Sequence, residues 1–312
     1  MVYYCYITNK EDDMATKKAA STTKKSTVKK SSPATSRPAV NKSSSASTRT
    51  NTSVRPKLSI ASSIPSNLAR IVGAEVLGTL ILTLVALLTF QEVLPLYIGL
   101  TVALLVFSLG SISGGHFNPA VTFGLWAARR FKLVLVPFYW AGQILGALAA
   151  VALLNAFSDG NLNLDLSHFT LFSWKFFSLE VIGTAVFLLG LMAAISVKNV
   201  SAITKGVGVG LSILVGILVS GGLFSAIQST QDWSTIKSFE EIPREYRISG
   251  ATLNPAVALA SYERTNSQVQ GSNASKDEEK FSRFGLDTIL GTLIGAALGT
   301  NLYLLLAWKR SS

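Results

Sequence analysis

The two stretches that decide the fold are 113–121, which reads SGGHFNPAV, and 249–257, which reads SGATLNPAV. Each contains the triplet Asn-Pro-Ala. Asn is a favoured helix N-cap, and Pro is favoured at the first helical position because its missing N–H would be unpaired there anyway. Each triplet therefore predicts the start of a helix. The motif residues are Asn118, Pro119, Ala120, Asn254, Pro255 and Ala256.

Both predicted helices are too short to cross a bilayer. The first runs from Pro119 to about Ala128, and the second from Pro255 to about Tyr262. At 1.5 Å per residue the first helix is ~15 Å long, which is half of a ~30 Å hydrocarbon core. The sequence thus predicts two re-entrant half-helices.

Other segments of the chain also occur twice. We therefore predict two repeats, over about 69–157 and 176–308. Each repeat holds three apolar spans, an odd number, so the two repeats have opposite orientations in a membrane. This inverted arrangement is typical of membrane transport proteins, with the site near the bilayer midplane. The matching pairs are AEVLGT at 74–79 with LEVIGT at 179–184, GLT at 99–101 with GLS at 210–212, and GQILGA at 142–147 with GTLIGA at 291–296.

The composition is that of a membrane protein. Of the 312 residues, 49% are hydrophobic and 14% are charged, and the mean hydropathy is +0.41. These values argue against a disordered chain and against an ordinary soluble domain. We predict an all-α membrane protein with six spanning helices, each long enough to cross the bilayer. The predicted spans are 69–91, 95–113, 133–157, 176–197, 206–226 and 286–308.

Most of the net charge of +11 lies in an N-terminal tail, residues 1–58, which holds 12 of the 28 Lys and Arg but three of the 17 acids. Its Ala, Ser, Thr, Lys and Pro composition predicts disorder. We expect residues 1–13 to be either an over-extended start, because Met14 opens a typical one, or poorly ordered. The tail has two interpretations, attraction to anionic lipid or a solvated topology determinant. We expect no nucleic acid as a partner, since aromatic residues do not interleave with the basic ones.

The charges of residues 59–312 predict an orientation. If the tail is cytoplasmic, six spans return the C-terminus to the same side. The inner segments then hold basic residues and no acid, as the positive-inside rule requires. We expect a multi-pass protein of the plasma membrane with both termini cytoplasmic. The inner basic residues are Arg70, Arg129, Arg130, Lys132, Lys198, Lys205, Lys309 and Arg310.

The inverted repeat brings the two half-helices together, start to start, at mid-membrane. Two positive helix ends then converge, and non-helical backbone at this depth is tolerated where it lines a polar cavity or is covered by protein. We expect the side-chain oxygens of Asn118 and Asn254 to cap their helices, which leaves the NH₂ groups as donors to a pore. A water that accepts both bonds turns its hydrogens along the pore, which interrupts a proton wire, and the helix ends repel cations.

With these motifs the sequence resembles the aquaporin family, the major intrinsic proteins, over about residues 69–308. The resemblance implies an aquaporin-like channel domain over 59–312, a homotetramer with one pore per subunit, and passive passage of water or small neutral solutes. The segments that carry the resemblance are 74–79, 113–122, 139–143 and 249–256.

The sequence departs from this family at the pore constriction, where members usually continue the second motif with Arg. Val257 stands at that place, and by spacing the other filter residues are Ile98, Ile217 and Ala251. Such an apolar filter favours small neutral molecules (glycerol, urea, ammonia or hydrogen peroxide) alongside water, as in an aquaglyceroporin-like channel with an atypical filter. An apolar ring could instead dewet and conduct water slowly.

A basic residue from elsewhere could replace the missing filter arginine. Arg244 and Arg247 are the candidates, because both stand just before the second motif.

Glu75 and Glu180 are the ionisable residues deep within the spans. They could accept hydrogen bonds from the half-helix loops, or they could couple protons, which predicts a proton-coupled secondary transporter as the alternative function. His116 and Gln143 are predicted to line or support the pore, and His116 could titrate near neutral pH or pack in a fixed place. The spans hold no nucleophilic or metal-binding constellation, so we expect neither an enzyme nor a cofactor nor a metal.

Overall fold

The computed structural model describes residues 64–158, 164–230, 242–265 and 280–308. In these residues, six helices are long and apolar enough to cross a membrane, which confirms the predicted all-α membrane fold. The spanning helices are α2 (Leu68–Leu88), α3 (Leu94–Ser113), α5 (Val136–Ser158, preceded by the 3₁₀ turn η2, Leu133–Leu135), α6 (Trp174–Ser196), α7 (Ala202–Gln228) and α11 (Leu286–Leu306). Two short elements that we did not predict are η3 (Ser167–Thr170) and α8 (Arg244–Arg247).

The spanning helices start and end close to the predicted limits, and local capping explains the main differences. Helix α7 begins at Ala202 rather than at residue 206, because the Ser201 side chain caps it by accepting a hydrogen bond from Thr204 N at 3.1 Å. Helix α2 ends at Leu88 rather than at 91, because Thr89 is extended. The predicted tail, residues 1–58 with the expected start at 1–13, lies outside the described residues.

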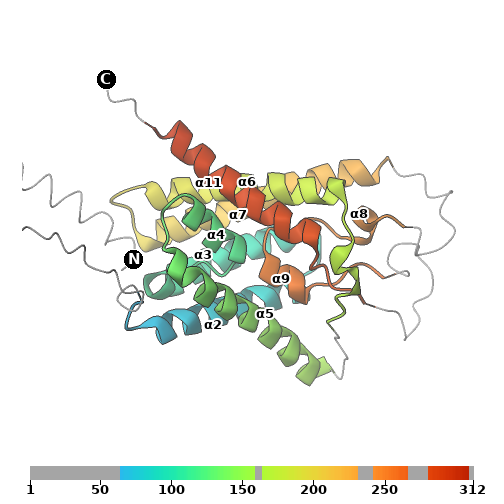
Figure 1. The fold of residues 1–312 in the computed structure, drawn as a ribbon, viewed down its shortest axis with the longest axis horizontal. Helices are drawn as coiled ribbons and strands as arrows, with labels where there is room; N and C mark the ends of the chain where they lie inside the picture. Colours follow the sequence, from blue (N-terminus) through green and yellow to red (C-terminus); the bar gives the residue numbers. More distant parts are fainter. Residues whose placement is uncertain (1–63, 159–163, 231–241, 266–279, 309–312) are drawn as a thin grey trace, which may run out of the picture. The chain divides into compact units, whose positions relative to one another are not determined.

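The two half-helices are α4 (Pro119–Ala127) and α9 (Pro255–Ala260), and Figure 1 shows both between the spanning helices. Helix α4 packs against α11 and α5, and α9 packs against α5 and α2. Helix α9 is shorter than predicted, because the chain turns to an extended conformation at Ser261 (ψ 156°) instead of continuing to Tyr262.

Glycines at matching places in the two repeats let matching helix pairs approach closely. A Cβ built on Gly146 of α5 would lie 2.4 Å from Val76 O of α2, and one on Gly295 of α11 would lie 2.4 Å from Val181 O of α6. Such distances exclude any side chain larger than glycine's at these places. The repeated sequence therefore builds the same helix crossing twice, as expected for a duplicated fold.

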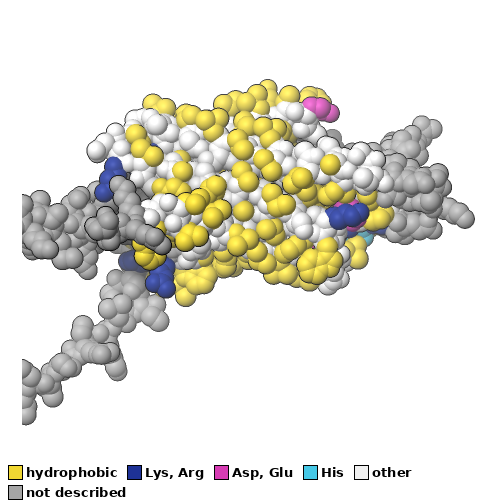
Figure 2. Space-filling view, turned by 90° about the horizontal axis from the view of Figure 1, so that it is seen from above, with side chains coloured by type: hydrophobic (Ala, Val, Ile, Leu, Met, Phe, Trp, Pro, Cys, Tyr) yellow, Lys and Arg dark blue, Asp and Glu magenta, His cyan; other side chains and the backbone are white. Residues whose placement is uncertain are grey.

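Charged side chains gather at the two ends of the helix bundle, and hydrophobic ones cover the length between them (Figure 2). In Figure 1 the start of α2, the α6–α7 connection and the end of α11 lie at one end of the bundle. The exposed basic residues of these segments include Arg70 and Lys198. This distribution fits a protein whose middle faces lipid and whose ends face water.

Candidate functional site

The side-chain oxygens of both motif asparagines cap the helices that follow. Asn118 Oδ1 accepts a hydrogen bond from Ala120 N at 2.8 Å. Asn254 Oδ1 accepts from Ala256 N at 3.0 Å and, more weakly, from Val257 N at 3.4 Å. Both asparagines are buried. The predicted N-caps are thereby confirmed.

The amide nitrogens of these asparagines tie the two loops to each other. Asn118 Nδ2 donates to Leu253 O at 2.7 Å, and Asn254 Nδ2 donates to Phe117 O at 3.0 Å. The expectation that both NH₂ groups would be left wholly for a pore was therefore wrong, because a carbonyl of the facing loop lies within reach of each. An amide has two N–H groups, so one of each asparagine remains. The reciprocal pair holds α4 and α9 start to start.

The carbonyls that accept these bonds belong to residues with strained backbone. Phe117 and Leu253 have φ of 49° and 55°, a left-handed conformation that is uncommon for bulky residues and costs of order 1–3 kcal/mol. Each side chain is packed on a helix glycine: a Cβ on Gly78 would lie 2.2 Å from the Phe117 ring, and one on Gly183 would lie 2.6 Å from Leu253 Cδ2. The same packing thus fixes both carbonyls toward the opposite asparagine.

Glu75 is fully buried and accepts four hydrogen bonds. Two come from the backbone of the loop before α4, from His116 N at 3.1 Å and Phe117 N at 2.7 Å. Two come from side chains, from Ser113 Oγ at 2.6 Å and Gln143 Nε2 at 2.8 Å. The carboxylate therefore anchors the loop, which confirms the expectation that it accepts backbone hydrogen bonds.

Glu180 performs the same task for the loop before α9. It is fully buried and accepts from Thr252 N at 2.8 Å, Thr252 Oγ1 at 3.0 Å and Leu253 N at 2.9 Å. Both oxygens of each glutamate are thus occupied by loop donors. These contacts explain why the two residues recur at twin positions of the repeat.

His116 is packed among aromatic rings. Its ring centroid lies 4.8 Å from that of Phe131 and 4.7 Å from that of Tyr139. Its Nδ1 lies 3.0 Å from Thr122 Oγ1, a hydroxyl that Gln143 Nε2 also contacts at 3.1 Å. These contacts fit the fixed packing role that the sequence left open for His116, and they make Gln143 a supporting residue.

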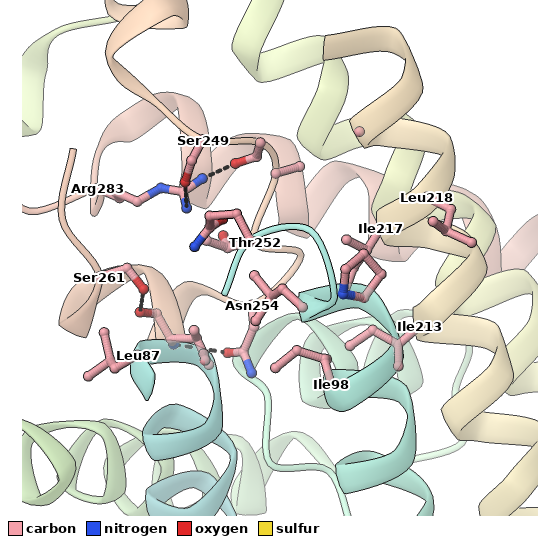
Figure 3. A pocket seen from close by; sticks show the side chains of 18 of the residues that line it. Leu87, Ile98, Ile213, Ile217, Leu218, Ser249, Thr252, Asn254, Ser261 and Arg283 are labelled. Carbon is pink, nitrogen blue, oxygen red and sulfur yellow. Dashed lines mark hydrogen bonds between the residues drawn. The ribbon is translucent and has the colours of Figure 1, made fainter. Parts of the chain in front are cut away.

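A cavity of about 480 Å³, which we call the α9 cavity, lies beside the second half-helix. All four predicted filter residues line it, together with Asn254, whereas Asn118 does not. Figure 3 shows three isoleucines on one side and polar side chains on the other. The lining includes Ile98, Ile213, Ile217, Ala251, Val257, Ser249, Gly250, Thr252, Ser261, Tyr262, Gln91 and Arg283.

Neither Arg244 nor Arg247 lines this cavity. Arg244 forms ion pairs with Glu263 and, at 2.8 Å, with Asp287. Arg247 Nε donates to Ile242 O at 2.9 Å. The hypothesis that one of these two arginines replaces the missing filter arginine is therefore not supported, because both are engaged elsewhere.

Arg283 is the basic residue among the described residues that line the α9 cavity. Sequence reasoning missed it, because it stands far along the chain from the second motif, in a segment expected to be a loop outside the membrane. No local pattern around Arg283 distinguishes it from the other charged residues of that loop.

Comparisons with known proteins agree with the sequence motifs. The family model described as major intrinsic protein matches residues 62–227. The chain is 36% identical over 150 residues to an aquaporin Z of Photorhabdus laumondii, which covers 40% of this chain and 65% of that protein. It is 37% identical over 149 residues to an aquaporin Z of Brucella melitensis, covering 42% and 64%.

The matched segments thus span slightly less than two thirds of these two relatives. Among solved structures, the X-ray structure of the aquaglyceroporin from Plasmodium falciparum is similar with a TM-score of 0.48 and 21% identity, covering 76% of this chain and 94% of that one.

Proposed function

Because the chain belongs to the major intrinsic protein family, we propose that it forms a passive membrane channel for water and small neutral solutes. The observation that carries this proposal is the reciprocal pair of hydrogen bonds between Asn118 and Asn254 and the facing loops. It brings the starts of two half-helices together within the helix bundle, where their positive ends converge.

The remaining N–H of each asparagine gives the proposed mechanism. A water between the two asparagines accepts both N–H groups and turns its own hydrogens away from them. Neighbouring waters then cannot pass a proton along a continuous chain. The two positive helix ends add an electrostatic barrier to cations. The pair thus allows water through while protons and cations are excluded.

The α9 cavity supports the solute class. One side presents apolar Ile98, Ile213 and Ile217, and the other presents polar groups such as Ser249 and Thr252. A small molecule with both hydrocarbon and hydroxyl or carbonyl groups matches such a lining. We therefore propose glycerol-like and urea-like solutes, with ammonia and hydrogen peroxide as smaller ones, alongside water.

The alternative, a proton-coupled transporter that uses Glu75 and Glu180, has less support. Both carboxylates anchor loops, and neither lines the α9 cavity. A coupling group must exchange a proton with a site that the substrate reaches. The passive channel is therefore the function that the geometry supports best.

The test is stopped-flow light scattering on proteoliposomes that hold the full chain, with protein-free vesicles as the control. We expect faster water and glycerol flux than in the control, flux that rises linearly with the gradient, and no accumulation against it. Uphill accumulation driven by a proton gradient would support the transporter instead. Permeabilities equal to those of protein-free vesicles for water, glycerol, urea and ammonia would refute the channel.

We further propose a homotetramer, a plasma-membrane location, and cytoplasmic termini with a basic tail that contacts anionic lipid. The exposed basic residues at the end of the bundle that holds the start of α2 support this orientation. Light scattering coupled to size exclusion would give the oligomeric state. Protease access to a tagged tail in sealed vesicles would give the orientation, and deletion of residues 1–58 would test the lipid contact.

A further inference from the structure

The second motif is not followed by the arginine that the family resemblance leads us to expect. The α9 cavity is nevertheless lined by an arginine from another part of the chain. Val257 occupies the place after Asn254-Pro255-Ala256. Arg283, from the loop before α11, lines the same cavity as Val257 and the other filter residues. An arginine distant in sequence thus reaches the site where the local sequence provides an apolar side chain.

Arg283 is held in this place from both its backbone and its side chain. Its N–H donates to Ser261 O at 2.9 Å, and its carbonyl accepts from Thr288 Oγ1 at 3.0 Å. Its guanidinium donates to Gly250 O and, at 3.4 Å, to Ser249 Oγ. These two residues belong to the loop before α9, so the guanidinium is pinned to the wall of the cavity (Figure 3).

Two polar atoms of the lining have no hydrogen-bond partner among the described residues. They are Arg283 Nε and the hydroxyl of Tyr262, and both are buried atoms of residues that line the α9 cavity. Buried polar groups in native proteins are nearly always hydrogen-bonded to protein or to a bound molecule. Both atoms are buried, so each is suited to a water enclosed in the protein beside the cavity and not to a solute that moves through it.

The charge of Arg283 acts on the cavity more directly than the other charges near it. Burial lowers the pKa of Arg283 to about 10, so its guanidinium keeps its proton at neutral pH. Glu180, whose charge interacts with it, bonds to the backbone behind the loop and does not line the cavity. The charges of Arg244 and Arg264 also act on Arg283, but neither residue lines the cavity.

We propose that Arg283 is the selectivity-determining cation of this channel, taking the part of an arginine that the second Asn-Pro-Ala motif lacks. Each of its two terminal nitrogens uses one N–H for Ser249 Oγ or Gly250 O, and the second N–H of each is a donor for the oxygen of water or of a small neutral solute, opposite the isoleucines. Its fixed charge adds to the cation barrier of the half-helix ends. This inference rests on the proposed channel function.

The first test compares Arg283→Met and Arg283→Lys in proteoliposomes, with Arg264→Met as the matched control. Arg264 is a partly buried arginine that donates to Tyr246 O and Ile248 O and lies outside the cavity lining. We expect Arg283→Met to raise proton permeability about tenfold or more, because a charge a few ångströms from the permeant changes its barrier by at least that much. Arg283→Lys and Arg264→Met should stay near the wild-type value.

The readouts separate this inference from the channel itself. If wild-type protein conducts neither water nor solutes, the channel function fails. If wild-type protein conducts and folded Arg283→Met excludes protons as well as wild type does, the role of Arg283 is refuted while the channel stands. Equal proton leaks in Arg283→Met and Arg264→Met would also overturn it, because the effect would then be one of general stability.

A second measurement keeps Arg283 in place, in case its variants do not fold. The sequence has one cysteine, Cys5, so Cys5→Ser with Ala251→Cys gives a single thiol at the cavity lining. We expect an anionic thiosulfonate reagent to modify this thiol about tenfold faster than a cationic one of similar size, because of the nearby guanidinium. Equal rates, or a faster cationic reagent, would overturn the proposal.

Discussion

The loop before α4 and the loop before α9 share a motif, a capping asparagine and a strained residue, but their carboxylates have different neighbours. Glu75 is bound by the side chains of Ser113 and Gln143 as well as by backbone. At the position that matches Gln143, the second repeat has Thr292, whose hydroxyl donates to Thr288 O instead. Glu180 has the charge of Arg283 nearby.

This difference accompanies a second one: the loop before α9 borders the α9 cavity, and Asn118 of the loop before α4 does not line it. In the first repeat, the neutral side chains of Ser113 and Gln143 donate hydrogen bonds to the buried Glu75. In the second repeat the charge of Arg283 lies near the glutamate, and Asn254, Ala251 and Val257 all line that cavity. Matched substitutions should therefore change selectivity more in the second loop than in the first, and those at the glutamates should change stability more in the first.

The largest difference should come from the carboxylates. Each oxygen of Glu75 accepts from two donors, so the NH₂ group of Glu75→Gln leaves two donors without an acceptor. One oxygen of Glu180 accepts only from Leu253 N, so the NH₂ group of Glu180→Gln can leave this single donor unpaired. Since each unpaired buried donor costs about 1–3 kcal/mol, we expect Glu75→Gln to lower the unfolding temperature by about 5–10 °C, and Glu180→Gln by about half as much. Thermal unfolding in detergent measures both.

The control for this pair is Glu92→Gln, at an exposed position of the short α2–α3 connection. It should leave the unfolding temperature unchanged. A larger drop for Glu180→Gln than for Glu75→Gln would contradict the assignment of the first loop as the more heavily bonded one.

The asparagines should differ in proton exclusion. Asn118→Asp and Asn254→Asp each lose one amide bond to the facing loop, so both should lose a similar stability of about 1–3 kcal/mol. Both variants place a carboxylate beside the water held by the asparagine pair, but only Asn254→Asp also adds one to the lining of the α9 cavity. We therefore expect both to raise proton permeability, and Asn254→Asp about tenfold more than Asn118→Asp, since an anion lowers the barrier to cations. A pH-sensitive dye inside vesicles measures the leak; equal leaks in the two variants would remove the distinction between the loops.

A larger side chain on the apolar side of the cavity should change solute selectivity more than it changes the stability of the fold. Val257→Arg adds bulk and a second cation to the lining, and we expect glycerol permeability to fall about fivefold with a smaller change for water. Val257→Met controls for size, because it adds length without charge. Glycerol and water fluxes unaltered by both substitutions would mean that Val257 does not border the conducting path.

The smallest effects should come from the serines at matching positions of the two loops. Ser113→Ala removes a hydrogen bond of 2.6 Å to Glu75 and should cost about 1 kcal/mol. Ser249→Ala removes a weak contact of 3.4 Å with Arg283 and should cost less than about 0.5 kcal/mol, with a measurable rise in proton leak. Chemical unfolding gives the first quantity and the dye assay the second.

Much of this molecule could be predicted from short stretches of sequence. Asn118 and Asn254 predict the helix starts that follow them, because capping acts within three residues. Glu75 and Glu180 could be predicted to have the same role, because they occupy equivalent positions in the two repeats. Ile98, Ile217, Ala251 and Val257 could be placed at one site because the sequence resembles the aquaporin family, and their spacing from the repeated motifs matches the constriction that this resemblance implies. All four line the α9 cavity.

The contacts that could not be predicted join residues far apart in the chain. The reciprocal bonds of Asn118 and Asn254 depend on how closely the two loops meet, which is set by the packing of Phe117 and Leu253 on helix glycines. The early end of α9 depends on Ser261 and on the chain that follows it, where Arg283 N bonds to Ser261 O. The periodicity of the sequence does not show how close residues far apart in the chain lie in the folded protein.

The sequence by itself determined the six spanning helices and the two half-helix starts, because hydropathy and capping are local properties, and its resemblance to a family indicated the four apolar filter residues. Only the tertiary structure decided which arginine faces the cavity. Arg244 and Arg247 lie closer to the second motif in sequence, but their side chains bind Asp287 and Ile242 O. Arg283 reaches the cavity because the start of α11 is held against the end of α9, a contact that depends on the packing of the whole bundle.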